Sequence, residues 1–536
     1  MHQLIKAESG ISEDQASISP DFPGSELILK TEFGTTYLQV TLGIFMVLST
    51  AFLAVLLKEN KYLKTVTELI PESGMMLFFG AVVAFIIGGG DVIAREVSDS
   101  EGILISPIYL SHNIVQHVLI APIILHASYE VYHPHFFGQI DKILIMAFVG
   151  TILNTIIIGL SLRYIFGPMF PDMNLFHCMT FAPIIAAVDP VAVLAVFEVV
   201  NAEKALYFLV FGEALLNDAV TFVLYEGIRE LAPIPTEDMS STPAMSYVYV
   251  LLSFLTAPLG GALIGFVCGL ASAFITKHTS ESTAVFKPMI AILFGVVAYG
   301  LTIVFGYSNI LGIIAYGITQ ERYTFGNMTV KASILTSNIV HTVGIIFEEL
   351  LFFILGAEFA AVGFYAVWDF ALVVIFIITV SRIIVTCGLC LIINKFTSKR
   401  PINWRWQILI IVGGLRGAIA FAMVVTYEGP FQKLFYDACL VVIFFTTIAN
   451  GILAKPLVNY LGLKAEAGVK TDYGKYYGHD EYQPGFLGKC WSSFDKTICR
   501  IFTKENAMHD AITKELKAGE NKEAFKKLQK VKYSNE

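Results

Sequence analysis

The sequence has little charge and lacks the marks of several protein classes. Only 15% of its 536 residues are charged, against about 25% in a soluble globular protein, which argues against a soluble fold. The net charge is −8 and no basic block is present, so nucleic acid is not an expected partner. No Gly-x4-Gly-Lys-Ser/Thr loop occurs, so ATP is not the expected driving force.

Other absences weaken an enzyme interpretation. The seven cysteines are scattered, and "CGLC" at 387–390 has no second pair, so ordinary packing within the membrane is expected. Residues 1–37 have no apolar signal-peptide core. "GGGD" at 88–91 and "YD" at 436–437 match the motifs of intramembrane aspartyl proteases, but in reversed order and far apart. We therefore expect no enzyme activity.

Apolar sequence is what the chain has in abundance. Hydrophobic residues make up 55% of it, and runs of about 20 residues recur, the length that crosses a bilayer as a helix. The sequence predicts an all-α polytopic membrane protein with an acidic tail (1–37), a transmembrane domain (38–458) and a polar tail (459–536). About thirteen spans are expected, at 38–58, 72–92, 108–129, 142–166, 176–200, 205–229, 246–276, 287–306, 309–320, 340–362, 366–394, 405–427 and 434–458.

The loop charges predict the orientation of these spans. When the loops are placed on alternate sides, thirteen Lys and Arg residues fall on one side. Only Arg95, Arg163, Arg229 and Lys433 fall on the other. Because cytoplasmic loops carry the excess of basic residues, we expect an extracellular N-terminus and a cytoplasmic C-terminal tail.

A few charged residues interrupt the apolar spans. A charge at the centre of a bilayer costs roughly 2.5–3.5 kcal/mol on insertion scales, so such residues either mark ion pathways or pair with one another. Both interpretations stay open for most of them, while the ion pathway is favoured for the two aspartates. The residues are Asp189, Glu213, Asp218, Glu348, Glu349, Arg382 and Arg416.

Two spans carry helix-breaking sequence. Asp189 precedes Pro190, and a proline inside a helix removes a backbone hydrogen bond. "GGLRG" at 413–417 has three glycines in five residues. These breaks fall in the fifth and twelfth spans, at matching positions of two six-span halves, which is typical of a transport site between inverted repeats. Asp189 and Arg416 could compensate the opposed helix dipoles there.

Asn217 and Asp218 are the candidate ion ligands. Sodium is a hard cation that prefers oxygen, and this pair offers a carboxylate beside an amide carbonyl. Burial disfavours the ionised carboxylate, so a proton and Na⁺ could compete for Asp218. The pair neutralises only one positive charge, which predicts one-for-one, electroneutral exchange without any cofactor beyond the transported Na⁺ and H⁺.

Three motifs carry a resemblance to a known family. "AAVDPVAVLAVFE", "FGEALLNDAVTFVLY" and "GGLRGAIAF" resemble the animal sodium/proton exchangers (NHE family), and the similarity runs through residues 38–458. The resemblance implies a thirteen-helix fold like that of the bacterial sodium/proton antiporters, a homodimer, and control of cell pH and volume. "AVDP" resembles the plasma-membrane members.

The resemblance also assigns residues. It implies that Asp218 is the main cation ligand, supported by Asp189 and Asn217. It gives Glu213, Arg382 and Arg416 a part in activity or stability. From the breaks and the buried charges we add Pro190 and Glu348 as supporting residues.

Two departures from the family pattern stand out. Ala214 replaces a serine beside Glu213, so the number of ion ligands could differ. The family's inhibitor-associated stretch, Pro-Pro-Ile-Ile-Leu-Asp, is here "APIILH", with Ala121, Pro122 and His126. His126 could sense pH, since histidine titrates near neutrality, although a packed, hydrogen-bonded histidine is favoured.

An amphipathic helix is expected at about 486–502 in the cytoplasmic tail. Its apolar side chains recur at helical spacing. The resemblance favours a calcineurin-B-like EF-hand protein as its partner; packing on the protein's own cytoplasmic surface and contact with membrane lipids stay open. The apolar residues are Trp491, Phe494, Ile498, Ile501 and Phe502.

Two further functions remain alternatives to exchange. Broken helices and acidic residues also suit a cation channel, but a single titratable site between repeats favours exchange. A transport-silent ion or pH sensor is the other alternative, and Ala214 makes it more plausible.

Overall fold

The structure is a computed structural model that describes a large part of the chain. Every regular element in the described residues is helical. The described residues are 72–88, 115–189, 197, 203–231, 244–280, 286–361, 368–396, 401–463, 494–495, 497–499 and 501–503. The helices are α4 (Glu72–Gly88), η2 (Val115–Leu119), α6 (Ile120–Val131), α7 (Pro134–Phe137), α8 (Ile140–Leu144), η3 (Ile145–Val149), α9 (Gly150–Phe166), α10 (Leu175–Ala186), α12 (Lys204–Leu231), α13 (Ala244–His278), α14 (Phe286–Val304), α15 (Asn309–Thr319), η6 (Gln320–Thr324), η7 (Phe325–Asn327), α16 (Val330–Ala361), α17 (Trp368–Phe396), α18 (Trp404–Val412), α19 (Ala418–Val425) and α20 (Gln432–Leu461).

The all-α membrane fold predicted from the sequence is confirmed. Ten of the expected spans begin on described helices, and seven described helices are long and apolar enough to cross a membrane. The expected starts at residues 108 and 366 lie outside the described residues. The first expected span, 38–58, and the acidic tail, 1–37, lie outside the described residues. The count of thirteen spans therefore stays a prediction.

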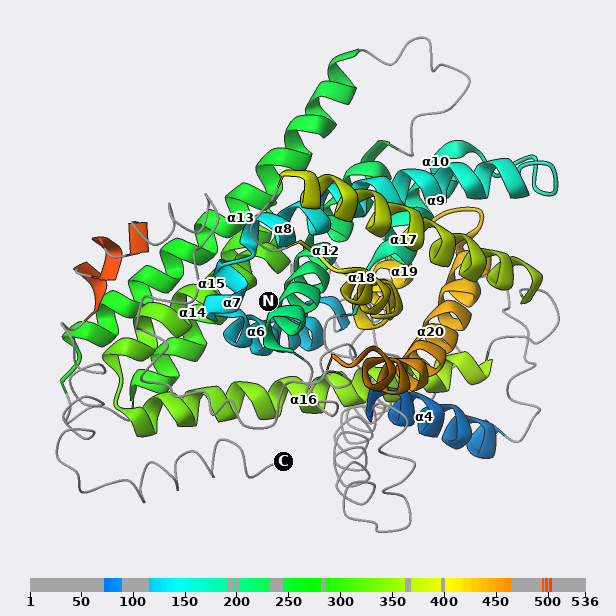
Figure 1. The fold of residues 1–536 in the computed structure, drawn as a ribbon. Helices are drawn as coiled ribbons and strands as arrows, with labels where there is room; N and C mark the ends of the chain where they lie inside the picture. The colour runs from blue at the N-terminus through cyan, green and yellow to red at the C-terminus, as the bar shows by residue number, and fades with distance from the viewer. Residues whose placement is uncertain are drawn as a thin grey trace, which may run out of the picture.

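The helices form two groups joined by α16, which runs along the lower edge of the molecule (Figure 1). On one side α13 contacts α14 and α15. On the other side α9, α10, α17 and α20 surround α18 and α19, and α12 touches both groups. Helix α16 contacts α14 on the first side and α4 and α20 on the second. Helices α18 and α19 thus lie between the other helices of the second group.

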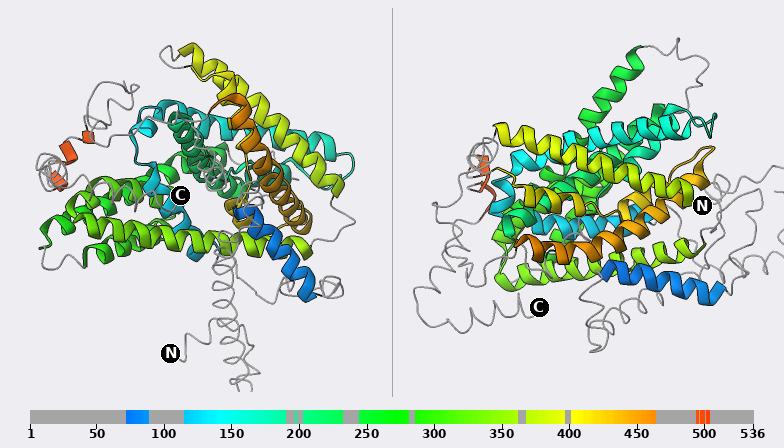
Figure 2. Two further views of the ribbon diagram at one scale, coloured as in Figure 1. Left: turned by 60° about the horizontal axis from the view of Figure 1, so that its bottom comes forward. Right: turned by 45° about the vertical axis from the view of Figure 1, so that its right-hand side comes forward.

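Glycines allow some helices to approach backbone to backbone. α4 and α16 lie side by side in both views of Figure 2. A Cβ at Gly80 would overlap the carbonyl oxygen of Phe353, and a Cβ at Gly356 would overlap that of Leu77. Gly265 of α13 approaches the backbone of α15 in the same way. Small residues at helix contacts are typical of membrane proteins, where dispersion contacts replace the hydrophobic driving force.

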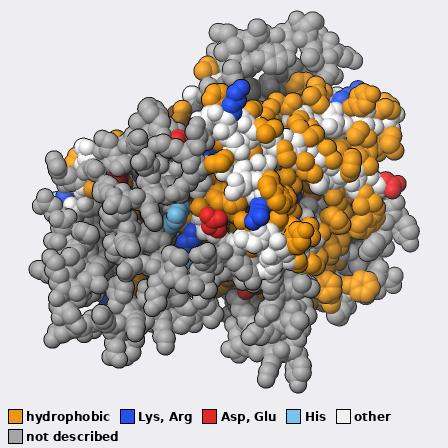
Figure 3. Space-filling model, viewed as in Figure 1, with side chains coloured by type: hydrophobic (Ala, Val, Ile, Leu, Met, Phe, Trp, Pro, Cys, Tyr) orange, Lys and Arg blue, Asp and Glu red, His pale blue; other side chains and the backbone are white. Residues whose placement is uncertain are grey.

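The outer surface of the second group is apolar. Figure 3 shows hydrophobic side chains over α9, α10, α17 and α20 with few charged side chains among them. Leu160, Phe376 and Leu391 are among the exposed apolar residues. So large an apolar surface is not stable in water and is what a helix facing lipid requires.

Helix α16 begins ten residues before the expected tenth span. The sequence placed the start at residue 340, where the apolar run begins, but the helix starts at Val330. The first three turns carry Lys331, Ser333 and Ser337, which lowered the hydropathy without breaking the helix. Hydropathy marks the part of a helix that suits lipid, and a helix can continue beyond it.

Candidate functional site

The first interrupted helix is α10. It ends at Ala186, and residues 187–189 are not helical. Ala187 has φ −58° and ψ 133°, and its N–H donates to the carbonyl oxygen of Pro183 at 3.1 Å. A residue before proline is disfavoured in the helical region, which explains why the chain is not helical at Asp189. Pro190 itself lies outside the described residues.

The second interruption separates α18 from α19. Residues 413–417, the "GGLRG" segment, leave the helix after Val412, and the chain becomes helical again at Ala418. Gly417 must be small because a Cβ there would overlap Oδ2 of Asp189. Both breaks predicted from the sequence are therefore present, and they touch one another.

The two breaks are joined by hydrogen bonds in both directions. The N–H of Asp189 donates to the carbonyl oxygen of Leu415 at 2.8 Å. The guanidinium of Arg416 donates to the carbonyl oxygens of Ala186 and of Ala187, the latter at 2.7 Å. A cation thus lies at the negative, carboxyl end of α10, and the Asp189 carboxylate lies against Gly417 at the positive, amino end of α19. Each charge opposes the dipole of the helix end it faces.

Helix α12 carries Glu213, Asn217 and Asp218, and each is only 1% exposed. Glu213 accepts two hydrogen bonds from Arg382 of α17, at 2.7 and 2.8 Å. Arg382 also donates to the carbonyl oxygen of Ile410 near the end of α18, at 3.2 Å. This pair ties α12 to α17 and to the first half of the interrupted helix. The sequence left open whether Glu213 and Arg382 mark an ion pathway or pair with one another, and the structure shows that they pair.

Asp218 differs from Glu213 in having no such bond. Within the described part of the chain, neither carboxylate oxygen of Asp218 has a hydrogen-bond partner, and the same holds for both side-chain polar atoms of Asn217. Buried polar groups are normally paired. The open bonding capacity of the Asp218 carboxylate therefore indicates a site whose occupant is an ion or water.

Asp218 and Asp189 share a small cavity at the crossing. Its volume is about 20 Å³, enough for one water-sized occupant. Gly417 also lines it, with apolar side chains from α6, α12, α15 and α19. Asn217 and Glu348 do not line the cavity. The expected pairing of Asn217 with Asp218 on one ion therefore stays a prediction.

The inhibitor-associated stretch lies on α6, next to this cavity. Ile120, Ile123, Ile124 and Ala127 line the cavity. Ala121 and Pro122 belong to the same helix and are half-buried. The sequence did not identify this apolar wall, because Ile and Ala at helical spacing are indistinguishable from ordinary core residues.

His126 is a packed, hydrogen-bonded histidine, the interpretation that the sequence favoured. It is buried, and its Nε2 lies 2.6 Å from Nδ1 of His341 on α16. His341 was missed because the polar segment around it contains no recognisable motif. Two acidic residues of α16, Glu348 and Glu349, are buried about two turns beyond His341.

The described part of the tail docks on the protein itself. Residues 494–503 contain helical residues, and Ile498 is buried against Ala273 and Tyr323. Phe494 and Ile501 are 50% and 55% exposed. Phe502 is half-buried, and Trp491 lies outside the described residues. The structure thus places one apolar residue of the tail helix inward and leaves two others accessible.

Polar contacts fix this tail helix. Arg322 of η6 donates two hydrogen bonds to the Asp495 carboxylate, at 3.0 and 2.8 Å. The Tyr323 hydroxyl donates to the same carboxylate at 2.9 Å. Burial and the adjacent Asp495 charge raise the pKa of the Tyr323 phenol, so it remains a donor at any physiological pH.

Crossed interrupted helices around a buried carboxylate define a helical membrane protein of the secondary-transporter class. Comparison of the sequence with protein families specifies which family of transporters this is. The family described as "Sodium/hydrogen exchanger, transmembrane" matches residues 39–460. The chain belongs to this family, as the motifs predicted.

Curated relatives agree with the family assignment. The chain is 32% identical over 418 residues to the Na(+)/H(+) exchanger beta of Oncorhynchus mykiss, covering 77% of this chain and 52% of that protein. It is 30% identical over 467 residues to sodium/hydrogen exchanger 3 of Homo sapiens, covering 82% of this chain and 54% of that protein. The chain spans about half the length of these relatives.

A solved structure agrees with the fold. The sodium proton antiporter MjNhaP1 from Methanocaldococcus jannaschii superposes with a TM-score of 0.56 at 15% identity, over 80% of this chain and 99% of that one. The predicted sodium/proton antiporter-like fold is therefore confirmed.

Proposed function

We propose that this protein exchanges Na⁺ for H⁺ by presenting the Asp218 carboxylate to the two sides of a membrane in turn. The observation that carries the proposal is the buried, unbonded carboxylate in a cavity of about 20 Å³ at the helix crossing. A carboxylate that accepts no hydrogen bond from the described residues can hold either a proton or a sodium ion. Because one occupant excludes the other, loading one ion requires release of the other.

The charges around the cavity support one-for-one exchange. Glu213 is neutralised by Arg382. Asp189 faces the amino end of α19, and Arg416 is held by carbonyl oxygens. Asp218 is then the group whose charge changes as an ion binds, so each cycle carries one positive charge in each direction. The proposed exchange is electroneutral, with Asp189 and Asn217 supporting the site.

The loop charges and the resemblance of "AVDP" to plasma-membrane exchangers support a cellular setting. We propose that the protein works in the plasma membrane as a homodimer, with the C-terminal tail in the cytoplasm, taking in external Na⁺ and releasing internal H⁺. A calcineurin-B-like EF-hand protein is the proposed partner of the tail helix. The exposed side chains of Phe494 and Ile501 support this proposal, since an EF-hand groove accepts apolar residues of a helix.

The test is recovery from an acid load. The protein is expressed in cells lacking their own exchangers, and cytosolic pH is followed with Na⁺, with K⁺ or with neither. We expect Na⁺-dependent recovery in the wild type and none in Asp218→Asn at equal surface expression. Asp437→Asn is the matched control, because Asp437 is a buried aspartate of α20 that does not line the cavity.

Two outcomes would contradict the proposal. Recovery that persists in Asp218→Asn would remove this carboxylate from the mechanism. A large Na⁺ conductance under voltage clamp would indicate a channel, because electroneutral exchange carries no net current.

A further inference from the structure

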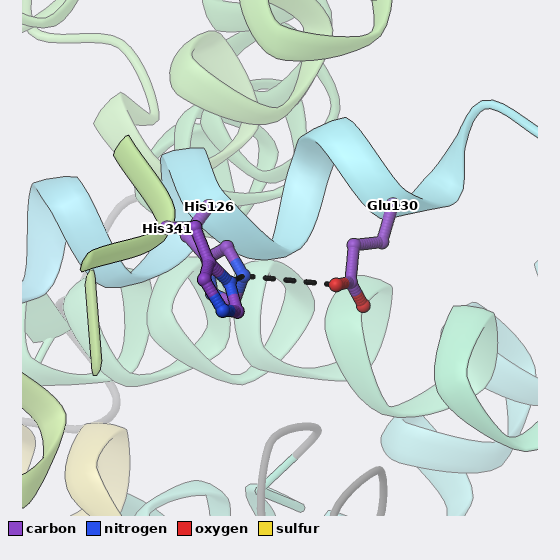
Figure 4. Close-up of side chains that lie close together, drawn as sticks. All are labelled: His126, Glu130 and His341. Atoms are coloured by element: carbon purple, nitrogen blue, oxygen red, sulfur yellow. Dashed lines mark hydrogen bonds and ion pairs between the residues drawn. The ribbon is translucent and has the colours of Figure 1, made fainter. Parts of the chain in front are cut away.

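Three potential metal ligands meet between α6 and α16, and none of them lines the Asp218 cavity. Nε2 of His126 lies 2.6 Å from Nδ1 of His341 and 3.6 Å from Oε1 of Glu130. One ligand atom from each of the three side chains lies within 4.8 Å of the other two. Figure 4 shows the Glu130 carboxylate directed along α6 towards the two imidazole rings.

The local sequence explains this convergence. His126 and Glu130 are four residues apart on α6, so they share one face of the helix. His341 comes from α16, where Gly344 lies one turn further along. A Cβ at Gly344 would lie 2.7 Å from Cβ of His126, closer than real Cβ atoms approach. The absence of a side chain at Gly344 therefore lets the His126 ring reach His341.

The donor set suits a divalent transition metal. Two imidazoles and one carboxylate are typical zinc ligands, and a site with three protein ligands leaves a fourth position for water. Zn²⁺ binds imidazole nitrogen at about 2.0–2.1 Å in a tetrahedron, which sets neighbouring ligand atoms roughly 3.3 Å apart. The His126–Glu130 distance is already close to this value. The two imidazole nitrogens must separate by roughly 0.7 Å, and His341 is the exposed ring of the two.

The cluster is also accessible. The Glu130 side chain is 35% exposed, whereas that of His126 is 10% exposed. His341 is exposed on α16. An ion can therefore enter from the side of Glu130 and His341 and reach the buried nitrogen of His126.

We propose that His126, Glu130 and His341 bind a zinc ion that bridges α6 to α16. The bridge would hold α6, which lines the Asp218 cavity with Ile120, Ile123, Ile124 and Ala127, against α16. The proposal does not depend on Na⁺/H⁺ exchange, because metal binding to this cluster can be measured without transport.

The experiment measures zinc binding by the purified full-length protein in detergent, prepared with an affinity tag that contains no histidine. A chromogenic chelator competes for Zn²⁺, and Co²⁺ reports coordination through its visible absorption bands. We expect one equivalent of tightly held zinc and a tetrahedral Co²⁺ spectrum in the wild type. Zinc should also raise the thermal unfolding temperature, because a ligand that binds only the folded state stabilises it.

Variants assign the ligands. His341→Ala removes an exposed ring, so the fold should survive, and zinc affinity should fall by at least about tenfold, as happens when even an outer-shell partner of a metal is lost. Glu130→Gln keeps the size of the side chain but removes its charge, so it should weaken zinc binding. Gly344→Ala should also weaken it by displacing His126. His278→Ala is the matched control, since His278 is an exposed histidine at the end of α13.

The results distinguish the zinc site from a simple histidine–histidine hydrogen bond. Zinc affinity, Co²⁺ spectrum and thermal shift that are equal in wild type and His341→Ala would overturn the proposal. So would a wild type that loses its zinc to the weakest chelator. Loss of binding in His341→Ala together with retention in His278→Ala would establish the site.

Discussion

Replacing either of two carboxylates of α12 by an amide should change the free energy of unfolding by very different amounts. Glu213→Gln and Asp218→Asn each replace a buried carboxylate by an amide, and both residues are 1% exposed. Glu213 accepts a bidentate pair of hydrogen bonds from Arg382, which is itself 5% exposed. The Asp218 carboxylate accepts no hydrogen bond from the described residues. The two substitutions therefore form a matched pair on one helix.

The expected magnitudes follow from these contacts. Glu213→Gln leaves the Arg382 guanidinium buried without its counter-charge, and breaking a buried pair in this way costs about 3–5 kcal/mol. Arg382 keeps the hydrogen bond to Ile410, which does not neutralise the charge. Asp218→Asn removes a charge and no hydrogen bond, so the free energy of unfolding should stay within about 1 kcal/mol of wild type or increase.

The assay is equilibrium unfolding of the purified protein in mixed micelles. A loss of about 3–5 kcal/mol is more than a hundredfold in the folding equilibrium, at about 1.4 kcal/mol per factor of ten. The double variant Glu213→Gln/Arg382→Gln should recover part of the loss, because no buried charge is then left alone. Equal stability of Glu213→Gln and Asp218→Asn, or additivity in the double variant, would refute the assignment of Glu213 as a structural partner.

Two further substitutions test the helix crossing and the tail. Gly417→Ala places a methyl group on Oδ2 of Asp189, and displacement of a positioned group by about 1 Å can reduce a rate on the order of a hundredfold. Na⁺-dependent pH recovery should fall accordingly. The control is Gly388→Ala of α17, where an added Cβ meets nothing within 4 Å, and its recovery rate should be normal. A normal rate in Gly417→Ala would show that the two breaks do not need their close contact. Asp495→Asn weakens the charge-assisted bonds to Arg322, worth about 1.5–3 kcal/mol for a charged group. Amide hydrogen exchange in the tail helix should then accelerate by roughly tenfold or more, and unchanged exchange would show that the tail is held by its apolar contacts alone.

The sequence was sufficient for the helices and for their breaks because both depend on local chemistry. Apolar length alone located α12, α14 and α17 to within two residues of their bounds. The Asp189–Pro190 step and the glycines of 413–417 change the preferred backbone conformation at their own positions. Their effect could therefore be predicted without knowledge of the fold.

Partner choice among the buried charges could not be read in the same way. Glu213 and Asp218 lie five residues apart in one apolar helix, and each could equally have paired with an arginine. Arg382 is 169 residues from Glu213, and His341 is 215 residues from His126. Which side chains meet over such separations is decided by helix packing and by the rotation of each helix about its axis, which composition and spacing do not encode.

The observed pairing explains how one carboxylate is kept available. Two arginines lie buried in this region, and either could have bound Asp218 permanently. Arg382 is held by Glu213, while Arg416 is held by the carbonyl oxygens of Ala186 and Ala187, which carry partial charge but no proton to exchange. The interruption of α10 supplies those carbonyls. The broken helix therefore does more than open space at the crossing, because its exposed carbonyls bind an arginine that could otherwise neutralise Asp218, the proposed transport carboxylate.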